Sequence, residues 1–559
     1  MTFFEYSHKF VIRRPSVSQP KFVFVSGGVI SGLGKGITTA SLSAILEAKG
    51  YKVSPMKVDM YLNQDAGTIR PSEHGEVYVT EDGLESDQDL GNYERFIGRP
   101  LSRANYMTTG QVYTEVLRKE RAFEYEGEDV EAIPHVTDEI IRRFDKAGEG
   151  ADVVIVELGG TVGEYQNGIF FEAARLMKLH RPADIIHVHV AFLPIPGNLG
   201  EMKTKPVQQS VRLLNSMGIQ PEFVVGRSSQ AMDDKRKERI SLFCGIPKEA
   251  VISNPDVGSI YEIPLLLEEQ RLGDMVCEKL GLKNRKSKLE PWMKMVDHIT
   301  KSTKEVNIGV VGKYFGTGAY TLSDVYISVI ESLKHAGWSE GVKPVLHWID
   351  STALEQIQTD GAGKFLDGHD GIVVPGGFGS RGIEGIIEAI RYAREKKIPY
   401  LGLCYGMQLA TIELARYVAH LDQAHTTEVM TDSPNPIIHV MPEQEKKMLK
   451  KEYGGTMRLG AWPCVLTKGT KLHEAYGADQ IIERHRHRYE FNNAYRDVLQ
   501  KAGLIIAGTT PDGQLVEAIE LRDHPFFIGV QYHPEFLSTP LKPHPLFAAF
   551  IRAAIKQIR

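Results

Sequence analysis

Cysteine is scarce in this sequence, with four residues among 559. They are Cys244, Cys277, Cys404 and Cys464, and no two of them show C-x-x-C spacing. This scatter argues against a disulfide framework and against a cysteine-based zinc cluster. It fits a reducing compartment, so we expect a cytoplasmic protein.

Long apolar runs and an excess of positive charge are also missing. No run approaches the roughly 18–20 residues that span a bilayer, so no membrane partner is expected. Residues 1–20 contain no apolar core of the kind that a signal peptide has, and we expect a short irregular tail there, to which we assign no function. The net charge is −5, which gives no overall basic field to favour nucleic acid.

The length of 559 residues predicts at least two domains. Apolar, β-branched runs alternate with amphipathic stretches, as in "KFVFVSGG", "DVVIVELGG", "VNIGVVGKY" and "IPYLGLCYG". This alternation is typical of parallel sheets that are covered on both faces. Residues 283–304 are instead rich in lysine and poor in strand signal, which predicts a linker with a helix carrying Trp292 and Met293. We therefore expect two doubly wound, mainly parallel α/β domains, residues 21–282 and 305–559.

Cys404 lies at a predicted strand-to-helix junction, in "IPYLGLCYGMQLATIELARYVA". Gly402 and Gly406 flank it as G-x-C-x-G, which is the thiol version of a nucleophile elbow. The N-terminus of the following helix favours a thiolate at this position. A lone cysteine is more often a small buried residue, but the two flanking glycines favour a nucleophile.

A nucleophilic thiol needs a base and an orienting carboxylate. "VQYHPEF" offers His533 and Glu535, which point to the same face if the backbone is extended, and Pro534 stiffens that geometry. Alone this motif would be weak, because histidine beside proline is common at surfaces. Together with Cys404 it predicts a catalytic triad.

"VVPGGFGSRG" supplies a candidate oxyanion hole. The backbone N–H groups of Gly376 and Gly377 would face the developing negative charge, together with the N–H of Tyr405. The elbow, the histidine motif and this glycine loop, in their order along the chain, resemble the class I glutamine amidotransferase domain. That resemblance implies hydrolysis of the glutamine side-chain amide through a thioester, with release of ammonia.

The first half contains "VSGGVISGLGKGITTA", a glycine-rich loop between a strand and a helix that carries Lys35. It departs from the usual G-x-x-x-x-G-K-[ST] pattern, because Val29 replaces the first glycine and Gly36 replaces the hydroxyl residue that would hold Mg²⁺. A flexible turn is the alternative, and a dinucleotide fingerprint fits worse. The strand–loop–helix context and the lysine favour a phosphate site.

A divalent ion at this loop must then be held by other residues. Asp87 and Asp89 lie in "GLESDQDLGNYERF", and Glu157 closes the apolar strand "DVVIVELGG". An acid at the carboxyl end of a strand beside a phosphate loop suits a hard cation. Without that loop, the two aspartates would be read as a solvated turn, whereas a carboxylate that ends a buried strand needs a partner.

Several lysines at predicted strand ends suit a polyphosphate substrate. Lys57 follows the second strand, and "GEMKTKPVQQS" places Lys203 and Lys205 two residues apart, with Gln208 nearby. Each lysine alone would be read as an ordinary surface residue. Their number favours a second phosphorylated ligand besides the nucleotide of the loop.

From about residue 21 to the C-terminus the chain resembles the CTP synthase family. The shared motifs are "SGGVISGLGKG", "HGEVYVTEDG", "LGNYERF", "TTGQVY", "VLRKER", "GGTVGE", "KTKP", "PGGFGSRGIEG", "GLCYGMQ", "GGTMRLG", "ERHRHRYEFNN" and "QYHPEF". The resemblance implies an N-terminal synthase domain and a C-terminal amidotransferase domain. It implies a C–N ligase in which ATP phosphorylates O4 of UTP and glutamine-derived ammonia, after an internal passage, attacks C4 to give CTP, the last step of de novo CTP synthesis.

The family also implies ligands and assembly. Mg²⁺ is the expected metal, GTP the activator and CTP the feedback inhibitor, and homotetramers are expected, with filaments as a further form. "ERHRHRY" is accordingly an amidotransferase element rather than a nucleic-acid patch.

The family's functional positions fall on defined residues of this chain. ATP contacts would come from Ser31, Gly32, Leu33, Gly34, Lys35, Gly36, Lys57, Asp89 and Asp256. The Mg²⁺ ligands would be Asp89 and Glu157. UTP or CTP contacts would come from Ser31, Glu164, Tyr165, Gln166, Lys203, Thr204, Lys205, Pro206, Val207, Gln208 and Arg239. Glutamine contacts would come from Gly377, Tyr405, Gly406, Met407, Gln408, Glu428 and Arg488. The GTP segment would include Arg381 and Glu384.

Two departures from the family pattern affect the pyrimidine site. The usual Asp-Ile-Glu after "GGTVG" is Glu164-Tyr165-Gln166, so the contacts of CTP inhibition can differ. A usual lysine is Arg239, which keeps the charge but not its point-like geometry. Another P-loop amidotransferase, such as a cobyric-acid-type amidase, is disfavoured by "KTKP" and "HGEVYVTEDG". A catalytically inactive nucleotide-binding scaffold or filament protein remains the alternative of a different class.

Overall fold

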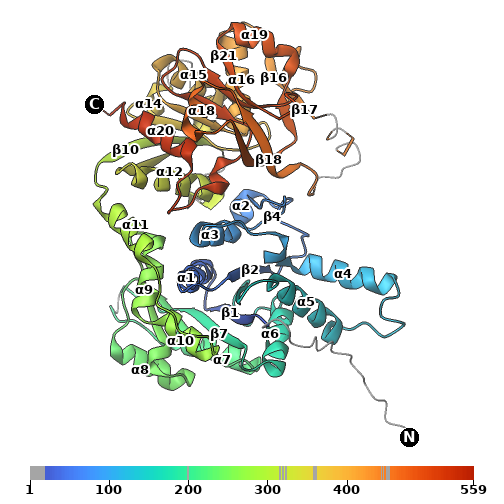
Figure 1. The fold of residues 1–559 in the computed structure, drawn as a ribbon, viewed down its shortest axis with the longest axis vertical. Helices are drawn as coiled ribbons and strands as arrows, with labels where there is room; N and C mark the ends of the chain where they lie inside the picture. Colours follow the sequence, from blue (N-terminus) through green and yellow to red (C-terminus); the bar gives the residue numbers. More distant parts are fainter. Residues whose placement is uncertain are drawn as a thin grey trace.

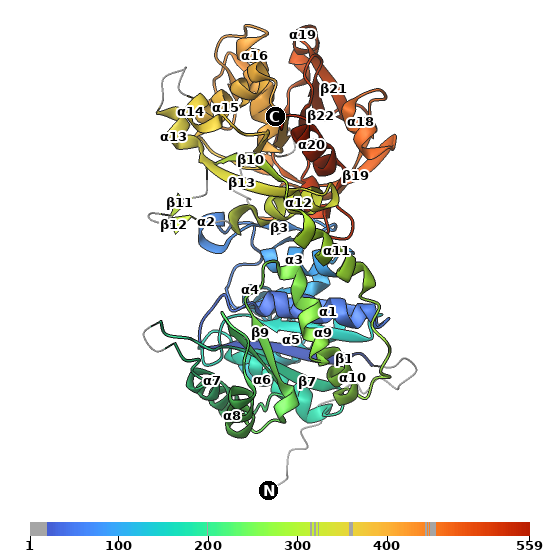
Figure 2. The ribbon, with the colours of Figure 1, turned by 90° about the vertical axis from the view of Figure 1, so that its left-hand side faces the viewer.

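The structure is a computed structural model that describes residues 19–197, 200–313, 316–317, 320–321, 324–356, 362–441, 444, 446–447 and 454–558. The predicted tail, residues 1–20, lies almost wholly outside the described residues. Two α/β bodies are stacked along the long axis of the molecule and joined along one side by helix α11, Glu290–Lys301 (Figure 1, Figure 2).

The N-terminal body is built on a seven-stranded sheet in which every pairing is parallel. Its strand order is β5-β2-β6-β1-β7-β8-β9. The strands are β1 (Lys21–Gly28), β2 (Val53–Asp59), β5 (Tyr106–Thr108), β6 (Val153–Leu158), β7 (Ile185–Phe192), β8 (Phe223–Ser228) and β9 (Val251–Pro255). All seven carboxyl ends therefore meet at one edge of the sheet.

Alternate residues of β1 supply the cores on the two faces of this sheet. Val23 and Val25 belong to one apolar cluster, which includes side chains of helices α1 (Lys35–Ala48), α3 (Gln88–Ile97), α7 (Lys205–Ser216), α8 (Asp234–Cys244), α9 (Ile263–Glu269) and α10 (Leu272–Lys279). Phe22 and Phe24 belong to the other, with α4 (Thr109–Arg121), α5 (Thr137–Ala147) and α6 (Gly168–His180). Burial on both faces explains why the strands are almost continuously apolar.

The C-terminal body contains a nine-stranded mixed sheet of order β13-β10-β14-β15-β23-β22-β21-β18-β19. The first five strands pair in parallel and the last four extend them antiparallel. The strands are β10 (Glu305–Gly312), β13 (Lys343–Asp350), β14 (Gly371–Val374), β15 (Tyr400–Leu403), β18 (Arg458–Leu466), β19 (Gln480–His487), β21 (Leu504–Thr509), β22 (Val516–Leu521) and β23 (Phe527–Val530). The predicted α/β class is confirmed, with the parallel part of this sheet leading into Cys404.

Helices cover both faces of this second sheet as well. Helices α12 (Ile327–Ser339) and α20 (Pro545–Ile555) share one apolar cluster, and α15 (Ile383–Lys396) and α16 (Tyr405–Tyr417) share the other. The remaining α-helices of the described residues are α2 (Pro71–His74), α13 (Ser351–Glu355), α14 (Gly363–Leu366), α18 (Lys471–Tyr476) and α19 (Arg496–Lys501). The remaining strands are β3 (Tyr78–Val79), β4 (Glu85–Ser86), β11 (Gly316–Thr317), β12 (Tyr320–Thr321), β16 (Ala424–Thr426), β17 (Asn435–Val440) and β20 (Tyr489–Phe491).

The connecting helix α11 packs on the N-terminal body through Trp292. The Trp292 ring lies 5.3 Å from the Phe96 ring and 6.0 Å from the Tyr261 ring, and its side chain is buried. Met293 points away, with 58% of its surface exposed. Of the two residues predicted on this helix, only Trp292 is buried against the N-terminal body.

Among the described residues, no helix combines the length and the apolar character that crossing a membrane would need.

Candidate active sites

The glycine-rich loop connects the end of β1 to the start of α1. Gly32 and Gly34 have φ values of 71° and 86°, in the left-handed region that favours glycine. Lys35 is the first residue of α1, and its Nζ donates to the backbone oxygen of Gly160 at 2.8 Å. A Cβ on Gly27 would lie 2.7 Å from Cδ of Lys35, so the missing side chain makes room for the lysine. Burial lowers the pKa of Lys35 against the opposing charge of Glu157.

Gly36 faces the carboxylate of Asp89. A Cβ at position 36 would lie 3.0 Å from Cγ of Asp89 and closer still to its Oδ1. Asp89 thus occupies the space into which the hydroxyl side chain of an ordinary P-loop would project. A side chain at position 36 would therefore displace the Asp89 carboxylate from the loop.

Lys57 lies between three carboxylates at the carboxyl edge of the sheet. Its Nζ bonds Oδ2 of Asp89, lies 3.2 Å from Oε1 of Glu157 and lies 3.7 Å from Oδ1 of Asp59. Burial opposes the lysine charge, but Asp89 and Glu157 outweigh it and raise the pKa of Lys57. Burial, helped by the charge of Asp89, raises the pKa of Glu157 to about 7.

The acids around Lys57 fit a hard divalent cation. Asp89 and Glu157 each bring one carboxylate oxygen to Nζ of Lys57 beside the glycine-rich loop, and the hydroxyl of Tyr93 donates to the other oxygen of Glu157. Carboxylate oxygens are what Mg²⁺ prefers. Because Gly36 has no side chain, the Asp89 carboxylate has room to lie beside the loop.

A second set of possible metal ligands lies beside Asp89 and Glu157, and two of its three members were not predicted from the sequence. One ligand atom each of Asp59, His74 and Asp87 lies within 4.8 Å of the others. Asp87 also caps helix α3 by accepting the N–H of Asp89 at 2.8 Å. Its hydrogen bond to His74 raises the pKa of that histidine. The position of Asp59 at the end of β2, two residues after Lys57, was the signal that could have revealed it.

The predicted ATP residues at the loop tip and beyond β9 also lie near the loop. Ser31 is exposed in the loop itself. Asp256 forms an ion pair with Arg227 at 2.9 Å, and a Cβ on Gly34 would lie 3.8 Å from Nε of that arginine. Arg227 was missed by the sequence analysis, and its place at the end of β8 was the available signal.

The predicted pyrimidine residues fall on two neighbouring surfaces. Glu164 accepts from the N–H and the hydroxyl of Thr161, at 2.7 Å and 2.6 Å, while Tyr165 is 99% exposed. A Cβ on Gly163 would lie 3.4 Å from Leu213, which places this loop beside α7.

The other pyrimidine residues lie at the start of α7 and on α8. Lys203 pairs with Glu201 at 2.7 Å, and Gln208 donates to Thr204 at 3.0 Å. Lys205 is the exposed first residue of α7, followed by Pro206 and Val207, and Gln166 is exposed in the loop beside this helix. Arg239 stands apart on α8, over the ring of Phe243.

The C-terminal body forms a strained turn at Cys404. This residue has φ 50° and ψ −97°, directly between β15 and α16. A Cβ on Gly402 would lie 2.8 Å from the carbonyl carbon of Gly406, and one on Gly406 would lie 3.2 Å from that of Val374. Both glycines are therefore needed for the tight turn at Cys404, whose side chain is buried, with 4% of its surface exposed.

His533 and Glu535 lie beside the thiol. Nδ1 of His533 is 2.7 Å from Oε1 of Glu535. The backbone there is a 3-10 helix, Pro534–Leu537, and not the extended segment from which the sequence argument placed the two side chains together. Burial opposes a charge on His533, but Glu535 and Cys404 outweigh it and raise the pKa of His533 to about 10.

Gly376 lies against both His533 and Cys404. A Cβ at this position would lie 2.8 Å from Cε1 of His533 and 3.8 Å from Cβ of Cys404. Among the described residues, Nε2 of His533 has no hydrogen-bond partner. The side-chain amide of Gln531 donates to Sγ of Cys404 at 3.5 Å. Gln531 was missed, although it lies only two residues before the predicted histidine.

A cavity of about 520 Å³ opens onto the triad. Four of the predicted glutamine residues line it, namely Gly377, Gln408, Glu428 and Arg488. The other three, Tyr405, Gly406 and Met407, are buried beneath it at the start of α16. Glu428 is oriented by accepting the N–H of Gly379 at 2.7 Å.

The predicted GTP residues do not line this cavity. Arg381 is exposed just before α15. Glu384 forms an ion pair with Arg416 at 2.7 Å, at the far end of α16 from Cys404.

The N-terminal body contributes part of the wall of the same cavity. Its lining residues are Gly67, Thr68, Ile69, Arg70, Pro71, Glu76 and Val77. Glu76 docks the segment by accepting from the N–H and hydroxyl of Ser328 on α12. The thiol therefore opens onto a space that both bodies enclose.

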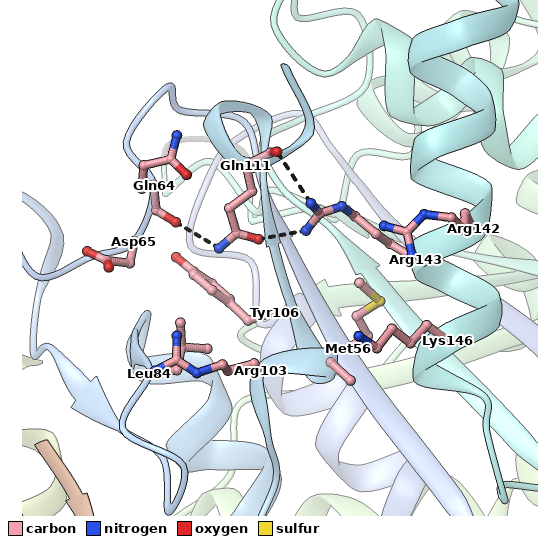
Figure 3. A pocket seen from close by; sticks show the side chains of 11 residues that line it. Met56, Gln64, Asp65, Leu84, Arg103, Tyr106, Gln111, Arg142, Arg143 and Lys146 are labelled. Atoms are coloured by element: carbon pink, nitrogen blue, oxygen red, sulfur yellow. Dashed lines mark hydrogen bonds between the residues drawn. The ribbon is translucent and has the colours of Figure 1, made fainter. Parts of the chain in front are cut away.

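A separate cavity of about 350 Å³ lies at the edge strand β5 and shares no lining residue with the first (Figure 3). Arg143 is held there by Gln111 at 3.1 Å and by Glu139 at 2.8 Å. Arg103, Arg142 and Lys146 line it too, so its wall is rich in positive charge. None of these residues was predicted to be functional.

Comparison with known proteins extends over nearly the whole chain. Residues 21–282 match the family model described as CTP synthase N-terminus, and residues 321–553 match the model described as glutamine amidotransferase class-I. The chain is 50% identical over 542 residues to the CTP synthase of Prochlorococcus marinus (strain NATL1A), covering 96% of this chain and 95% of that protein. It is 50% identical over 539 residues to the CTP synthase of Carboxydothermus hydrogenoformans, covering 96% and 99%. Among solved structures, the glutaminase domain of Trypanosoma brucei CTPS with bound acivicin is 39% identical, covering 45% of this chain and 94% of that chain, with a TM-score of 0.42.

Proposed function

Since the chain belongs to the CTP synthase family, whose members are glutamine-hydrolysing C–N ligases, we propose that it converts UTP to CTP at the expense of ATP and glutamine. One observation carries the proposal. The thiol of Cys404, which lies at a strained backbone turn, opens onto a cavity that residues of both bodies line. The N-terminal body carries the glycine-rich loop with Lys35 and the nearby acids Asp89 and Glu157. This arrangement supports an ammonia source and a phosphoryl-transfer site within one chain.

The amidotransferase half releases ammonia. The thiolate of Cys404 attacks the side-chain carbonyl of glutamine, and the N–H groups of Gly377 and Tyr405 face the developing oxyanion. His533 gives its proton to the leaving nitrogen, so the C–N bond breaks, a thioester forms and ammonia departs. Water then hydrolyses the thioester to glutamate, and Glu535 holds the imidazole during both steps.

Glutamine itself is held by the residues around the thiol. Glu428 suits its α-amino group and Arg488 suits its α-carboxylate, because both charged side chains line the cavity. Gln408 lines it as well.

The synthase half activates the pyrimidine ring. The γ-phosphoryl group of ATP is transferred to O4 of UTP, while the loop N–H groups, Lys35 and Lys57 neutralise the phosphates. Ammonia then attacks C4, and the phosphate leaves with O4. Asp89 and Glu157 would hold Mg²⁺, which would neutralise phosphate charge when bound.

Substrate recognition is assigned to the loops around this centre. Ser31 and Asp256 serve ATP, and the surfaces that carry Glu164, Lys203 and Gln208 serve UTP. Ammonia would travel from the thiol through the cavity that both bodies line.

Regulation and assembly are proposed to follow the family. GTP would activate the enzyme near Arg381 and Glu384, and CTP would inhibit it at the UTP site. A homotetramer is proposed from the family alone, with filaments as a further form. We place the enzyme in the cytoplasm.

The test is to measure CTP formation from UTP, ATP, Mg²⁺ and glutamine, with GTP present. We expect CTP, with one glutamate and one ADP formed for each CTP. No product under saturating conditions would contradict the proposal and favour a nucleotide-binding scaffold. Turnover of another acceptor, but not of UTP, would favour a different P-loop amidotransferase.

A further inference from the structure

A buried polar cluster joins the two bodies directly behind the triad. It consists of Tyr78 on β3, Glu94 on α3 and Arg484 on β19, and the Arg484 side chain is 1% exposed. Nη2 of Arg484 lies 2.8 Å from Oε2 of Glu94, and its Nη1 donates to the hydroxyl of Tyr78 at 2.8 Å. Nη1 also donates to the backbone oxygen of Val79 at 3.0 Å. Both terminal nitrogens of the Arg484 guanidinium, on a strand of the C-terminal body, are thus bonded by groups of the N-terminal body.

This cluster touches His533 along two routes. The backbone oxygen of Arg484 accepts the N–H of His533 at 2.8 Å. The ring of Tyr78 lies edge-on to the ring of Phe536 at 4.9 Å, and the Phe536 ring stacks on His533 at 5.2 Å and 13°. One route fixes the backbone of the catalytic histidine, and the other fixes the plane of its imidazole.

The hydroxyl of Tyr78 is shared between the two bodies. It lies 2.7 Å from Oε2 of Glu94 and 3.0 Å from the backbone oxygen of Phe536. A single hydroxyl proton serves these two acceptors, while the oxygen accepts from Arg484. Removing the hydroxyl would therefore loosen both the ion pair and the segment that carries the triad.

Helix α3 connects the cluster to the synthase centre. It begins next to Asp87, carries Asp89 in its first turn, and presents Tyr93 to Glu157. Glu94, the next residue, also accepts the N–H of Leu101 at 2.8 Å. The same short helix therefore holds a candidate metal ligand and the partner of Arg484.

Burial makes this cluster sensitive to the loss of any member. A guanidinium left without its carboxylate in a dry interior is strongly unfavourable, so the surrounding backbone would shift to let water reach it. Burial also raises the pKa of Glu94, against the opposing charge of Arg484. The backbone that would shift includes the carbonyl group of Arg484, which accepts the N–H of His533.

We propose that Tyr78, Glu94 and Arg484 are positioning residues for glutamine hydrolysis: the synthase body holds the catalytic histidine of the amidotransferase body in place through them. The inference rests on the proposed function. It makes docking of the two bodies a condition for full glutaminase activity, and it assigns no role in binding glutamine to the three residues.

The test uses two mild variants of the full chain, Tyr78→Phe and Glu94→Gln. We expect kcat for glutamine-dependent CTP synthesis to fall about tenfold in each, because a misplacement of about 1 Å at a reacting centre costs about 100-fold and these mild variants should move the base by less. KM for glutamine should stay within about twofold, since Glu428 and Arg488 are untouched. CTP synthesis from ammonium chloride should also stay within about twofold.

Matched controls separate positioning from general destabilisation. Tyr51→Phe removes a buried hydroxyl that donates to the backbone oxygen of Lys283, far from the triad. Glu413→Gln weakens the buried ion pair with Arg394, at 2.9 Å, inside the C-terminal body. Both controls should keep the kcat of glutamine-dependent synthesis within about twofold.

Two results would overturn the inference. One is an equal fall of the glutamine-dependent and ammonia-dependent rates in Tyr78→Phe and Glu94→Gln, which would indicate a merely structural role. The other is behaviour of these variants like that of Tyr51→Phe and Glu413→Gln. Failure of the proposed function would look different, because the unmodified chain would then form no CTP from either nitrogen source.

Discussion

Replacing Gly36 by serine would restore the ordinary P-loop residue, yet the structure predicts loss of synthesis. The new Cβ would lie 3.0 Å from Cγ of Asp89 and closer still to Oδ1, whereas such atoms normally stay about 3.5 Å apart or more. The carboxylate would have to retreat by roughly 1 Å. A displacement of that size at a reacting centre costs about 100-fold in rate, or about 2.7 kcal/mol of transition-state stabilisation.

The assay for Gly36→Ser is CTP formation from ammonium chloride, which bypasses Cys404. Stability should hardly change, because serine has a higher helix propensity than glycine by roughly half a kcal/mol. Gly168→Ser is the matched control, since a Cβ at that helical position has nothing within 4 Å. A wild-type rate for Gly36→Ser would refute the reasoning, because it would mean that a hydroxyl at position 36 can serve as in other P-loops.

Three further predictions address the lysine, the triad and the pyrimidine loop. Lys57→Met should lower ammonia-dependent synthesis by at least about 100-fold, because Lys57 is assigned to the phosphates of ATP. Glutamine hydrolysis, followed as glutamate release, should stay within about twofold. Equal losses of both activities would contradict the assignment of Lys57 to the synthase site. In Glu535→Gln the pKa of His533 should fall from about 10 toward its ordinary value of 6.5. Because the folded protein binds this proton more tightly than the unfolded chain, its stabilisation is complete below pH 6.5 and is lost as pH rises through 10. The melting temperature of the unmodified protein should therefore decline over that window more steeply than that of Glu535→Gln, and parallel curves would argue against the pairing. Exchanging Glu164-Tyr165-Gln166 for Asp-Ile-Glu should change the CTP concentration that halves activity, and an unchanged value would show that the departure is silent.

Local sterics explain why the fold and the nucleophile turn could be predicted from sequence. The continuous apolar strands predict a two-faced parallel sheet, and the seven-stranded sheet confirms this. The role of Gly402 and Gly406 could be predicted because each glycine makes room for nearby backbone. Gly402 makes room for the backbone of Gly406, and Gly406 makes room for the neighbouring strand at Val374. The contact of His533 with Glu535 was expected on an extended backbone, but the 3-10 turn after Pro534 brings the two side chains together instead.

Long-range packing explains what the sequence could not reveal. Arg484 and Glu94 are 390 positions apart, and neither carries a local signal of its partner. His74 on helix α2 lies 2.9 Å from Asp87, beside Asp59 at the end of β2, although no local pattern in the sequence links the three residues. In the antiparallel half of the second sheet, only β18 and β21 are paired without being consecutive strands, whereas β18–β19, β21–β22 and β22–β23 pair neighbours in the chain.

The central claim is that one body makes ammonia and the other uses it. The most direct measurement is CTP formation by Cys404→Ala with glutamine and, separately, with ammonium chloride as the nitrogen source. We predict that glutamine-dependent synthesis is lost while ammonia-dependent synthesis stays within about twofold of the unmodified protein, because the thiol only supplies nitrogen. Loss of both activities in a folded variant, or retention of the glutamine-dependent one, would contradict the account.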